Sequence, residues 1–328
     1  MVDRVMDREL ASGSFQRQRS HFRDWVGIDP STAAASKYPV ARGRYHLYVS
    51  LACPWCHRTA IVRELAGLGD ALPISYVAPF RDERGWAFTG ERFEVGRPHS
   101  AEHWVGEYVD PLHHWEFMSQ AYIASAPDFD ARVTVPVLWD TQSGRIVNNE
   151  SSEIIRMLAS PDSLGALGEH KLDLYPEELR EQIDDLNERV YSDVNNGVYS
   201  AGFARRQSAY ERAFTKLFEC FEWLEQLLSQ RRYLAGERIT EADWRLFPTL
   251  VRFDEVYHLH FRCNYRRIVE YPNLWAYTRE LYQWPEVAQT VAMDQIKRHY
   301  YTTHDELNPK HIIPLGPAPA WDEPHGRG

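Results

Sequence analysis

The sequence predicts an α/β amino-terminal half followed by an all-helical carboxy-terminal half. Residues 45–49 form an aromatic and β-branched run typical of a strand, and apolar residues at 61, 65 and 68 then recur as on one face of a helix. A second strand is expected at residues 72–77, which completes a β-α-β unit. In the second half, large apolar residues follow one another at spacings of three and four, the pattern of a long amphipathic helix. These residues are Phe214, Leu217, Phe218, Phe221, Leu224 and Leu228.

A hairpin and a short helix are expected to complete the first half. Residues 134–139 and 145–148 have the composition of strands, and a run of turn-forming residues at 140–144 separates them. Pro136 lies inside the first of these strands and cannot donate to its ladder, which implies an edge strand, a bulge or a cis bond. The helix is expected to start at Glu150.

Less regular segments divide the rest of the chain. Residues 1–43 have the character of an irregular arm, and residues 161–176 that of a linker. The segment at about 79–127 is rich in Trp and His and lacks periodicity, and so long an irregular stretch is usually functional or an insertion. We therefore predict two domains, residues 1–160 with the arm and this insertion, and residues 161–328 with an extended tail.

Composition and charge exclude several classes of protein. The 328 residues are 44% hydrophobic and 26% charged, which is typical of a globular protein with ample material for a core. The 37 Lys and Arg against 47 Asp and Glu give a formal charge of −10, which disfavours a nucleic-acid partner. No apolar run approaches the length of a membrane helix, and the amino terminus has no apolar signal region, so we expect no membrane partner and a cytoplasmic location. Four cysteines in so long a chain are too few for a disulfide framework.

Cys53 is the strongest candidate for a chemical role. Pro54 suits the first turn of the helix that follows the first strand, because its missing N–H costs nothing there. Cys53 is therefore expected at the helix N-terminus, beside unpaired N–H groups and the positive end of the helix dipole. This environment stabilises a thiolate, and the thiolate is the nucleophilic form of cysteine. The corner predicts thiol chemistry.

Cys53 and Cys56 lie three residues apart and allow several interpretations. They could be a redox dithiol, half of a zinc site or, with His57, a haem attachment motif. Alternatively, only one of them is a nucleophile, or both are ordinary core cysteines. Haem attachment requires export, for which the chain shows no signal. A zinc site requires a second ligand pair, and the adjacent His113 and His114 are typical of a surface loop. We favour a reactive thiol and expect no metal.

Two further features fit a peptide-like ligand. If the Val135-Pro136 bond is cis and lies beside the thiol, the backbone N–H and C=O of Val135 face such a ligand. Glu150 and Ser151, at a helix start, could hold an amino-acid head group, with the hydroxyl and helix N–H groups on its carboxylate and Glu150 on its ammonium. Each feature alone has an ordinary explanation, a strand and a helix cap.

Several motifs of this chain resemble glutathionyl-hydroquinone reductases, the Xi class of the glutathione transferase superfamily. The similarity spans nearly the whole chain and involves long motifs. They are Cys-Pro-Trp-x-His-Arg at 53–58, Gly-Trp at 85–86, residues 132–140, 149–154, 195–204 and 296–301, and the Pro-containing tail at 308–317.

The resemblance implies a fold, a reaction and a set of site residues. It implies a thioredoxin-like amino-terminal domain, an all-helical glutathione-transferase carboxy-terminal domain and a homodimer. Cys53 would attack the sulfur of a glutathionyl-hydroquinone, the hydroquinone would leave, and a second glutathione would release oxidised glutathione. The implied glutathione-binding residues are Trp86, Arg132, Val135, Glu150 and Ser151. The implied hydroquinone-pocket residues are Tyr199 and Tyr300, which would also assist catalysis, and Tyr301 as a third.

Some alternatives stay open. The position of Cys56 is commonly alanine in the family, so Cys56 is either a resolving thiol, as in a dithiol glutaredoxin, or a small buried residue, which we favour because the reaction needs one thiol. The tyrosines could be packing residues. The chain could instead be a general thiol–disulfide oxidoreductase, a deglutathionylase or omega-type dehydroascorbate reductase, or a non-catalytic binding module. Mycothiol could replace glutathione as the thiol.

Overall fold

The computed structural model describes residues 15, 17–96 and 103–327, and the chain forms two compact units. Among these residues, the first unit contains 19–173 together with 286–299, and the second contains 174–285, 300–327 and the few described residues before 19. Each unit is described by itself. Residues 1–14 and 16 of the expected amino-terminal arm lie outside the described residues.

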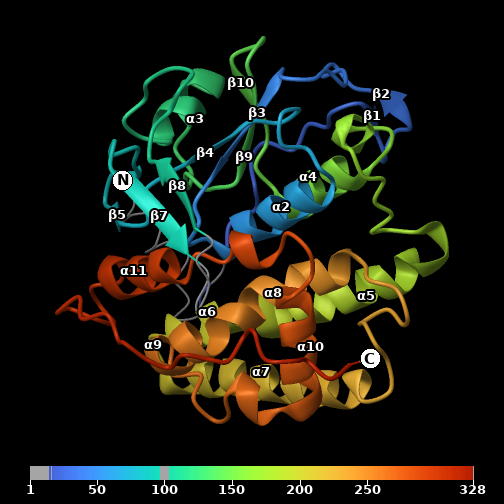
Figure 1. The fold of residues 1–328 in the computed structure, drawn as a ribbon. Helices are drawn as coiled ribbons and strands as arrows, with labels where there is room; N and C mark the ends of the chain where they lie inside the picture. Colours follow the sequence, from blue (N-terminus) through green and yellow to red (C-terminus); the bar gives the residue numbers. More distant parts are fainter. Residues whose placement is uncertain (1–14, 16, 97–102, 328) are drawn as a thin grey trace. The chain divides into compact units, whose positions relative to one another are not determined.

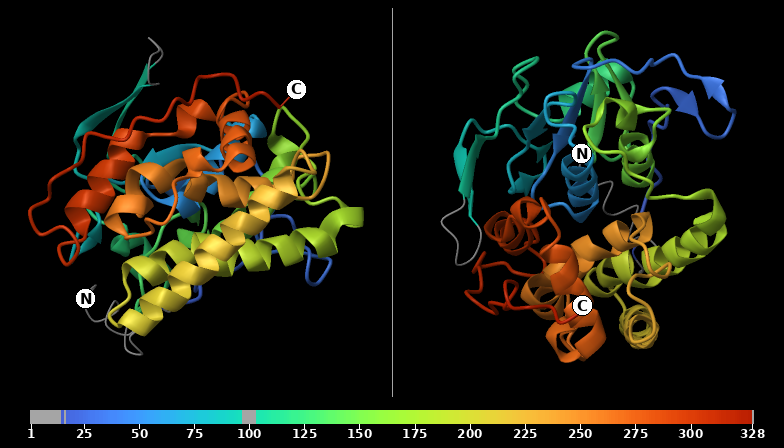
Figure 2. Two further views of the ribbon diagram at one scale, coloured as in Figure 1. Left: turned by 90° about the horizontal axis from the view of Figure 1, so that it is seen from below. Right: turned by 45° about the vertical axis from the view of Figure 1, so that its right-hand side comes forward.

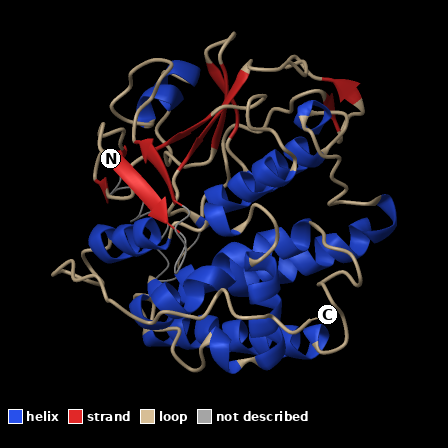
Figure 3. Ribbon diagram, in the orientation of Figure 1, coloured by secondary structure: helices blue, strands red, loops and turns tan. Residues whose placement is uncertain are grey.

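The first unit is built on a four-stranded mixed sheet (Figures 1 and 3). Its strands are β3 (Tyr45–Val49), β4 (Ile74–Tyr76), β9 (Val137–Asp140) and β10 (Arg145–Asn148), in the order β10-β9-β3-β4. β3 and β4 are parallel, whereas β9 runs antiparallel to both β3 and β10. Every residue of β3 and β9 is buried, which explains their aromatic and aliphatic composition. The predicted strands are confirmed, but β9 starts only after Pro136, which has no N–H to donate.

Helices α2 (Pro54–Leu65) and α4 (Ser151–Ala159) lie side by side beside this sheet, as Figure 1 shows. Pro54 occupies the first turn of α2, as predicted. A third helix, α3 (Ser119–Ser125), contacts β10. This β-α-β unit, hairpin and helix give the first unit its thioredoxin-like fold, which confirms the predicted fold class.

The segment at 79–127 was expected to be irregular, but it contains two hairpins and α3. The strands are β5 (Arg81–Asp82), β6 (Gly85–Trp86), β7 (Arg92–Gly96) and β8 (His103–Glu107). In β7, exposed and buried residues alternate, and its buried Phe93 and Val95 pack against Leu51, Ala78 and Tyr108. This period of two is a strand signal that the sequence analysis missed. A further hairpin, β1 (Ile28–Asp29) and β2 (Ala34–Ala35), lies in the arm.

Residues 286–299 complete the first unit although they lie far along the chain. The segment includes η6 (Ala288–Thr290) and the first part of α11 (Met293–Thr303). His57 of α2 is buried, and its Nε2 lies 2.8 Å from the Thr290 hydroxyl oxygen. Because the Thr290 hydroxyl donates to the Val287 carbonyl, His57 Nε2 must carry the proton and donate. The His57–Thr290 bond therefore fixes the start of α2 to this distant segment.

The regular structure of the second unit, among the residues described, consists of helices, as predicted. They are α5 (Arg180–Val190), η3 (Tyr191–Asn195), α6 (Gly197–Gly202), α7 (Gln207–Leu228), α8 (Glu241–Arg252), η4 (Phe253–Tyr257), α9 (His258–His260), η5 (Ile268–Glu270), α10 (Pro272–Tyr282) and the end of α11. One short 3-10 turn, η1 (Leu164–Leu167), lies in the predicted linker, and a second, η2 (Glu177–Leu179), follows it directly. No helix of the described chain is long and apolar enough to span a bilayer.

The long helix α7 packs against α6 and α10, as the views in Figure 2 show. Its predicted apolar face is buried from Leu217 to Leu228. Gly202 ends α6 directly against the Phe261 ring, where an added Cβ would lie 2.3 Å from a ring carbon. Any larger residue at Gly202 would therefore push α6 away from Phe261.

Asp243 organises the start of α8 from a fully buried position. Its Oδ2 accepts the Thr240 N–H at 2.8 Å, as part of a capping box at the start of α8. Its Oδ1 accepts the Leu234 N–H at 3.0 Å and the Tyr277 hydroxyl at 2.7 Å. Burial raises the pKa of Asp243, and these hydrogen bonds oppose that rise.

Replacing Asp243 should destabilise the second unit strongly. In Asp243→Ala, three buried donors lose their acceptor, and each unsatisfied group costs about 1–3 kcal/mol. We expect the free energy of unfolding, measured by urea denaturation, to fall by at least about 3 kcal/mol. Asp185→Ala, at an exposed position of α5, is the matched control and should change it by less than about 0.5 kcal/mol. A similar, small loss in both variants would show that Asp243 does not hold the helix start.

Candidate active site

Cys53 occupies the N-cap position of α2 with extended backbone dihedrals, φ −77° and ψ 124°. Its side chain is 7% exposed, and its thiol lies 3.7 Å from the Val135 carbonyl oxygen. The Cys53 N–H donates to the Ser50 carbonyl at 3.1 Å, which closes the turn between β3 and α2. The sulfur thus lies at the positive end of the α2 dipole, where a thiolate is stabilised.

Cys56 lies one turn further along α2 and is 1% exposed. Its sulfur accepts the Ser50 N–H at 3.3 Å. The other two thiols belong to the second unit and have a different environment. Burial raises the pKa of Cys220 to about 12 and also raises the pKa of Cys263, so both remain protonated at neutral pH.

Val135 lies beside the Cys53 thiol, in the segment just before β9, and the Val135-Pro136 peptide bond is cis. Tyr122 of α3 holds this segment from behind. The Tyr122 hydroxyl donates to the Thr134 carbonyl at 2.8 Å and accepts from the Asn149 side-chain amide at 3.0 Å. A buried three-residue network therefore joins the Val135 segment to the corner that starts α4. The sequence analysis missed Tyr122, because its spacing to the other members carries no signal.

Glu150 and Ser151 form the start of α4. Glu150 is the N-cap and accepts hydrogen bonds from the Ser152 N–H at 3.1 Å and from the Ser20 hydroxyl at 2.8 Å. Ser151 is buried, and its hydroxyl lies 3.5 Å from a guanidinium nitrogen of Arg58. Arg58 itself is 2% exposed and stacks on the Trp55 ring at 4.5 Å. The α4 N-terminus, Ser151 and Arg58 together present positive charge and donors, as a carboxylate ligand requires.

Glu150 retains its negative charge although it is largely buried. Burial alone would raise its pKa, but the hydrogen bonds from Ser152 and Ser20 and the charge of Arg58 outweigh burial and lower it. A half-buried carboxylate beside a helix start that can bind a carboxylate suits a ligand that carries an ammonium and a carboxylate on one carbon. The γ-glutamyl end of glutathione has this pair, so the residues present fit glutathione.

Trp86 and Arg132 are the remaining predicted glutathione-binding residues. Trp86 in β6 is buried and stacks on the His299 ring, with centroids 5.1 Å apart and an interplanar angle of 23°. His299 Nδ1 lies 2.6 Å from the Pro79 carbonyl, which can only accept, so Nδ1 carries a proton. Arg132 is half-buried in the segment that leads to Val135. His299 was not singled out by the sequence analysis, although it lies in a motif of the resemblance.

The second unit brings Tyr199 and Tyr300 together. Their hydroxyl oxygens lie 2.5 Å apart, and the Tyr257 hydroxyl lies 2.9 Å from that of Tyr300. Burial raises the pKa of Tyr257 and of Tyr300 well above the usual value, so both hydroxyls stay protonated. Arg17 lies over the Tyr199 ring at 5.1 Å. Tyr257 is the member of this cluster that the sequence analysis missed, because it lies in a π-helical turn, η4, with no motif of its own.

Tyr301 does not join the tyrosine cluster through its hydroxyl. This hydroxyl donates to the Glu255 carbonyl at 3.0 Å, and the ring packs edge-on against His260. Tyr301 and Tyr300 are adjacent in α11, so their side chains diverge by about 100° around the helix. The geometry thus separates the two neighbours, one in the hydroxyl cluster and one bound to backbone.

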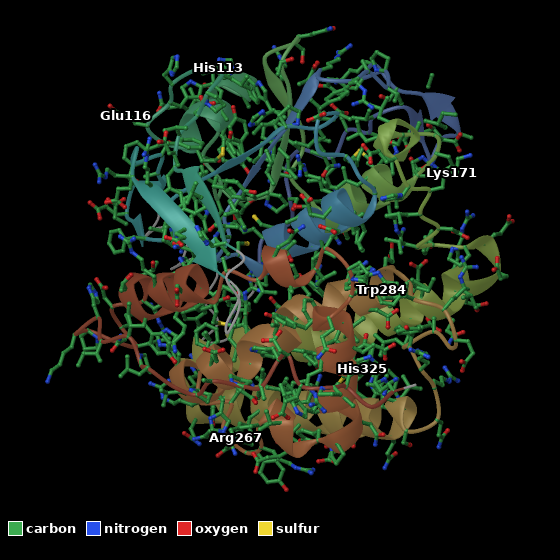
Figure 4. All side chains as sticks on the ribbon, viewed as in Figure 1. His113, Glu116, Lys171, Arg267, Trp284 and His325 are labelled. Carbon is green, nitrogen blue, oxygen red and sulfur yellow. The ribbon has the colours of Figure 1, made fainter. Side chains whose placement is uncertain are left out.

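The haem and zinc interpretations of the cysteine pair find no support in the geometry. The His57 nitrogen is committed to Thr290, as described above. His113 is exposed and stacks on Trp115, and Figure 4 shows it at the periphery together with Glu116. Among the residues that the structure describes, no three His, Cys, Asp or Glu side chains are grouped to hold a metal ion.

Two family models match the chain. Glutathione S-transferase, N-terminal domain, matches residues 52–160, and Glutathione S-transferase, C-terminal domain, matches residues 207–280. The matched ranges include Cys53, Glu150 and Ser151 in the first case. They place the thiol corner and the α4 corner in one recognised domain.

Characterised relatives are similar over nearly their whole length. The glutathionyl-hydroquinone reductase YqjG of Escherichia coli (strain K12) is 46% identical over 99% of this chain and 95% of its own. The glutathionyl-hydroquinone reductase PcpF of Sphingobium chlorophenolicum is 44% identical over 96% of this chain and 94% of its own.

Solved structures agree with these relatives. The glutathione-bound structure of YqjG from Escherichia coli K-12 superimposes with a TM-score of 0.85 over 94% of this chain and 96% of that chain, at 46% identity. A Xi-class glutathione transferase from Natrialba magadii superimposes with a TM-score of 0.86 over 96% of this chain and 92% of that chain, also at 46% identity. The chain therefore belongs to the glutathionyl-hydroquinone reductases, the Xi class of the glutathione transferase superfamily.

Proposed function

We propose that this protein is a glutathionyl-hydroquinone reductase that acts through Cys53. The observation that carries the proposal is the position of the Cys53 sulfur, at the N-terminus of α2 and 3.7 Å from the Val135 carbonyl. Relatives named for this reaction are 44% and 46% identical to it over nearly the full chain. A thiolate at such a corner suits exchange at sulfur.

The reaction proceeds in two thiol-exchange steps. The Cys53 thiolate attacks the glutathione sulfur of the aromatic adduct, the carbon–sulfur bond breaks, and the released aromatic carbon takes up a proton to give the hydroquinone. This step leaves a Cys53–glutathione mixed disulfide. A second glutathione thiolate then attacks the glutathione sulfur of this disulfide, which returns the Cys53 thiolate and releases oxidised glutathione.

The first unit supplies the groups that bind the glutathionyl part. Ser151, with Arg58 behind it, binds the γ-glutamyl carboxylate, and Glu150 binds the adjacent ammonium. The Val135 backbone pairs with the cysteinyl peptide group, which brings the glutathione sulfur to Cys53. Trp86 and Arg132 contribute to the same ligand as further binding residues.

The tyrosine cluster of the second unit supplies the groups that bind the hydroquinone part. Tyr199 and Tyr300 hydrogen-bond the ring oxygens and stabilise the charge that develops as the carbon–sulfur bond breaks. Tyr257 holds Tyr300 in place through its hydroxyl. Tyr301 adds ring surface to the pocket, while its hydroxyl is held by Glu255.

We further propose that the protein works in the cytoplasm as a homodimer, with glutathione as its cosubstrate and no nucleic-acid or membrane partner. The reducing cytoplasm keeps Cys53 a thiol. The γ-glutamyl site formed by Glu150 and Ser151 favours glutathione over mycothiol, which has no γ-glutamyl group.

Mass spectrometry after a single turnover tests the proposed reaction. We expect hydroquinone release to depend on Cys53, so Cys53→Ala should lower kcat by about 1,000-fold or more. Any covalent adduct trapped on Cys53 before it is resolved should carry glutathione and not the quinone. A covalent adduct that contains the aromatic ring would contradict attack at sulfur.

Glu150→Gln should raise KM for the glutathionyl substrate and leave kcat nearly unchanged. Removal of a charged hydrogen-bond partner costs about 1.5–3 kcal/mol, which corresponds to a rise in KM of about 10–100-fold. Because the pKa of Glu150 is lowered, its carboxylate and this contribution to binding should persist as the pH falls to about 5. Glu153→Gln, three residues further along in α4, is the matched control. Equal KM changes in both variants would place the ammonium elsewhere.

Tyr300→Phe and Tyr199→Phe should lower kcat by about 10–100-fold, as expected for the loss of a proton donor or hydrogen bond in the transition state. Tyr301→Phe should have a smaller effect, since its hydroxyl already binds a carbonyl. Tyr271, a buried tyrosine whose hydroxyl has no hydrogen bond, offers the control Tyr271→Phe. Steady-state kinetics with unchanged kcat for Tyr300→Phe would remove the cluster from the mechanism.

A further inference from the structure

Cys56 lies where its sulfur can react with the sulfur of Cys53 but is shielded from other thiols. It is the third residue of α2 after the N-cap, so its side chain and that of Cys53 lie on one face of the first helical turn. Residues three apart in a helix have Cβ atoms about 5–6 Å apart, and a disulfide needs about 3.5–4.5 Å, so the two residues must approach each other by about 1–2 Å when their sulfurs bond. At 1% exposure, the Cys56 sulfur is shielded from solutes, whereas Cys53 is its neighbour on the same turn.

The Cys56 sulfur also accepts a hydrogen bond from the backbone. The Ser50 N–H donates to the Cys56 sulfur at 3.3 Å, while the Ser50 carbonyl accepts the Cys53 N–H at 3.1 Å. A donor aimed at sulfur stabilises the thiolate form, and both thiols lie in the positive field of the α2 N-terminus. A small apolar residue at this position would leave the Ser50 N–H without this acceptor. The Cys56 sulfur thus has a backbone donor beside it, as a thiolate requires.

We propose that Cys56 resolves the Cys53–glutathione mixed disulfide within the protein. The inference rests on the proposed function, which supplies that disulfide. The Cys56 thiolate attacks the Cys53 sulfur, the bond between Cys53 and glutathione breaks, and one glutathione thiolate leaves. The product is a Cys53–Cys56 disulfide, so the two electrons that reduced the aromatic adduct come from the cysteine pair.

This route separates the two halves of the reaction. The first half needs the glutathionyl part of the substrate, because Glu150 and Ser151 hold it. The second half then reduces an intramolecular disulfide, which two glutathione molecules or one dithiol reductant can accomplish. With two glutathione molecules, the overall products are again hydroquinone and oxidised glutathione. With a dithiol, glutathione is released in its reduced form and the dithiol is oxidised.

A single turnover without free thiol tests the role of Cys56. The enzyme is mixed with an equimolar amount of a glutathionyl-hydroquinone, quenched in acid and treated with an alkylating agent. The mass of the intact protein is then measured by mass spectrometry. We expect the wild type to lose two hydrogens, to release glutathione, and to resist alkylation at Cys53 and Cys56. Cys56→Ala and Cys56→Ser should release hydroquinone equally but keep one glutathione on Cys53. Because serine retains an acceptor for the Ser50 N–H, Cys56→Ser separates lost chemistry from altered packing.

The matched controls are Cys220→Ala and Cys263→Ala, which remove thiols that burial keeps protonated and which should behave as the wild type. A glutathione adduct that persists on the wild type as on Cys56→Ser would overturn the inference and leave the proposed function intact. Absence of hydroquinone release would instead count against the proposed function. In that case, oxidised glutathione is used to form the same mixed disulfide on Cys53, and its conversion or persistence decides the role of Cys56.

Discussion

The start of α2 is the constraint on which the rest of the first unit depends. Pro54 fits only the first turn of the helix, so the helix begins there and Cys53 becomes its N-cap. The same start orients His57 toward Thr290 and Cys56 toward the Ser50 N–H. A shift of the helix start by one residue would move all three side chains to other faces, since successive residues are about 100° apart.

The two units handle charge in opposite ways. In the first unit, hydrogen bonds and Arg58 lower the pKa of Glu150, so a half-buried carboxylate stays ionised. In the second, burial raises the pKa of Tyr257 and Tyr300, so both hydroxyls stay neutral. The first environment suits a zwitterionic peptide end, and the second suits a neutral phenolic ring whose oxygens need donors and acceptors.

Local features of the fold and the site could be predicted from the sequence, and non-local ones could not. β3, α2 and the start of α4 at Glu150 could be predicted from composition, spacing and capping over a few residues. The network of Tyr122, Thr134 and Asn149 joins three elements without any fixed spacing, and only the folded chain reveals it. The return of residues 286–299 to the first unit is equally invisible, because helical periodicity in α11 does not say which partner the helix has. The β7 strand was predictable from its alternation but is short and lies in a segment rich in Trp and His.

Burial alone does not decide which of the four cysteines is reactive. The exposed fractions are 7% for Cys53, 1% for Cys56, 1% for Cys220 and 0% for Cys263, which are too similar to separate them. The difference lies in what surrounds each sulfur. Cys220 and Cys263 lie in surroundings where desolvation is the largest effect on the thiol and raises its pKa. Cys53 is the N-cap of α2 and Cys56 lies in its first turn, where the positive end of the helix dipole and, for Cys56, the Ser50 N–H replace the water that burial removes. The direction of the backbone dipoles, which the position of Pro54 sets, therefore distinguishes the two cysteines at the start of α2 from the two in the second unit.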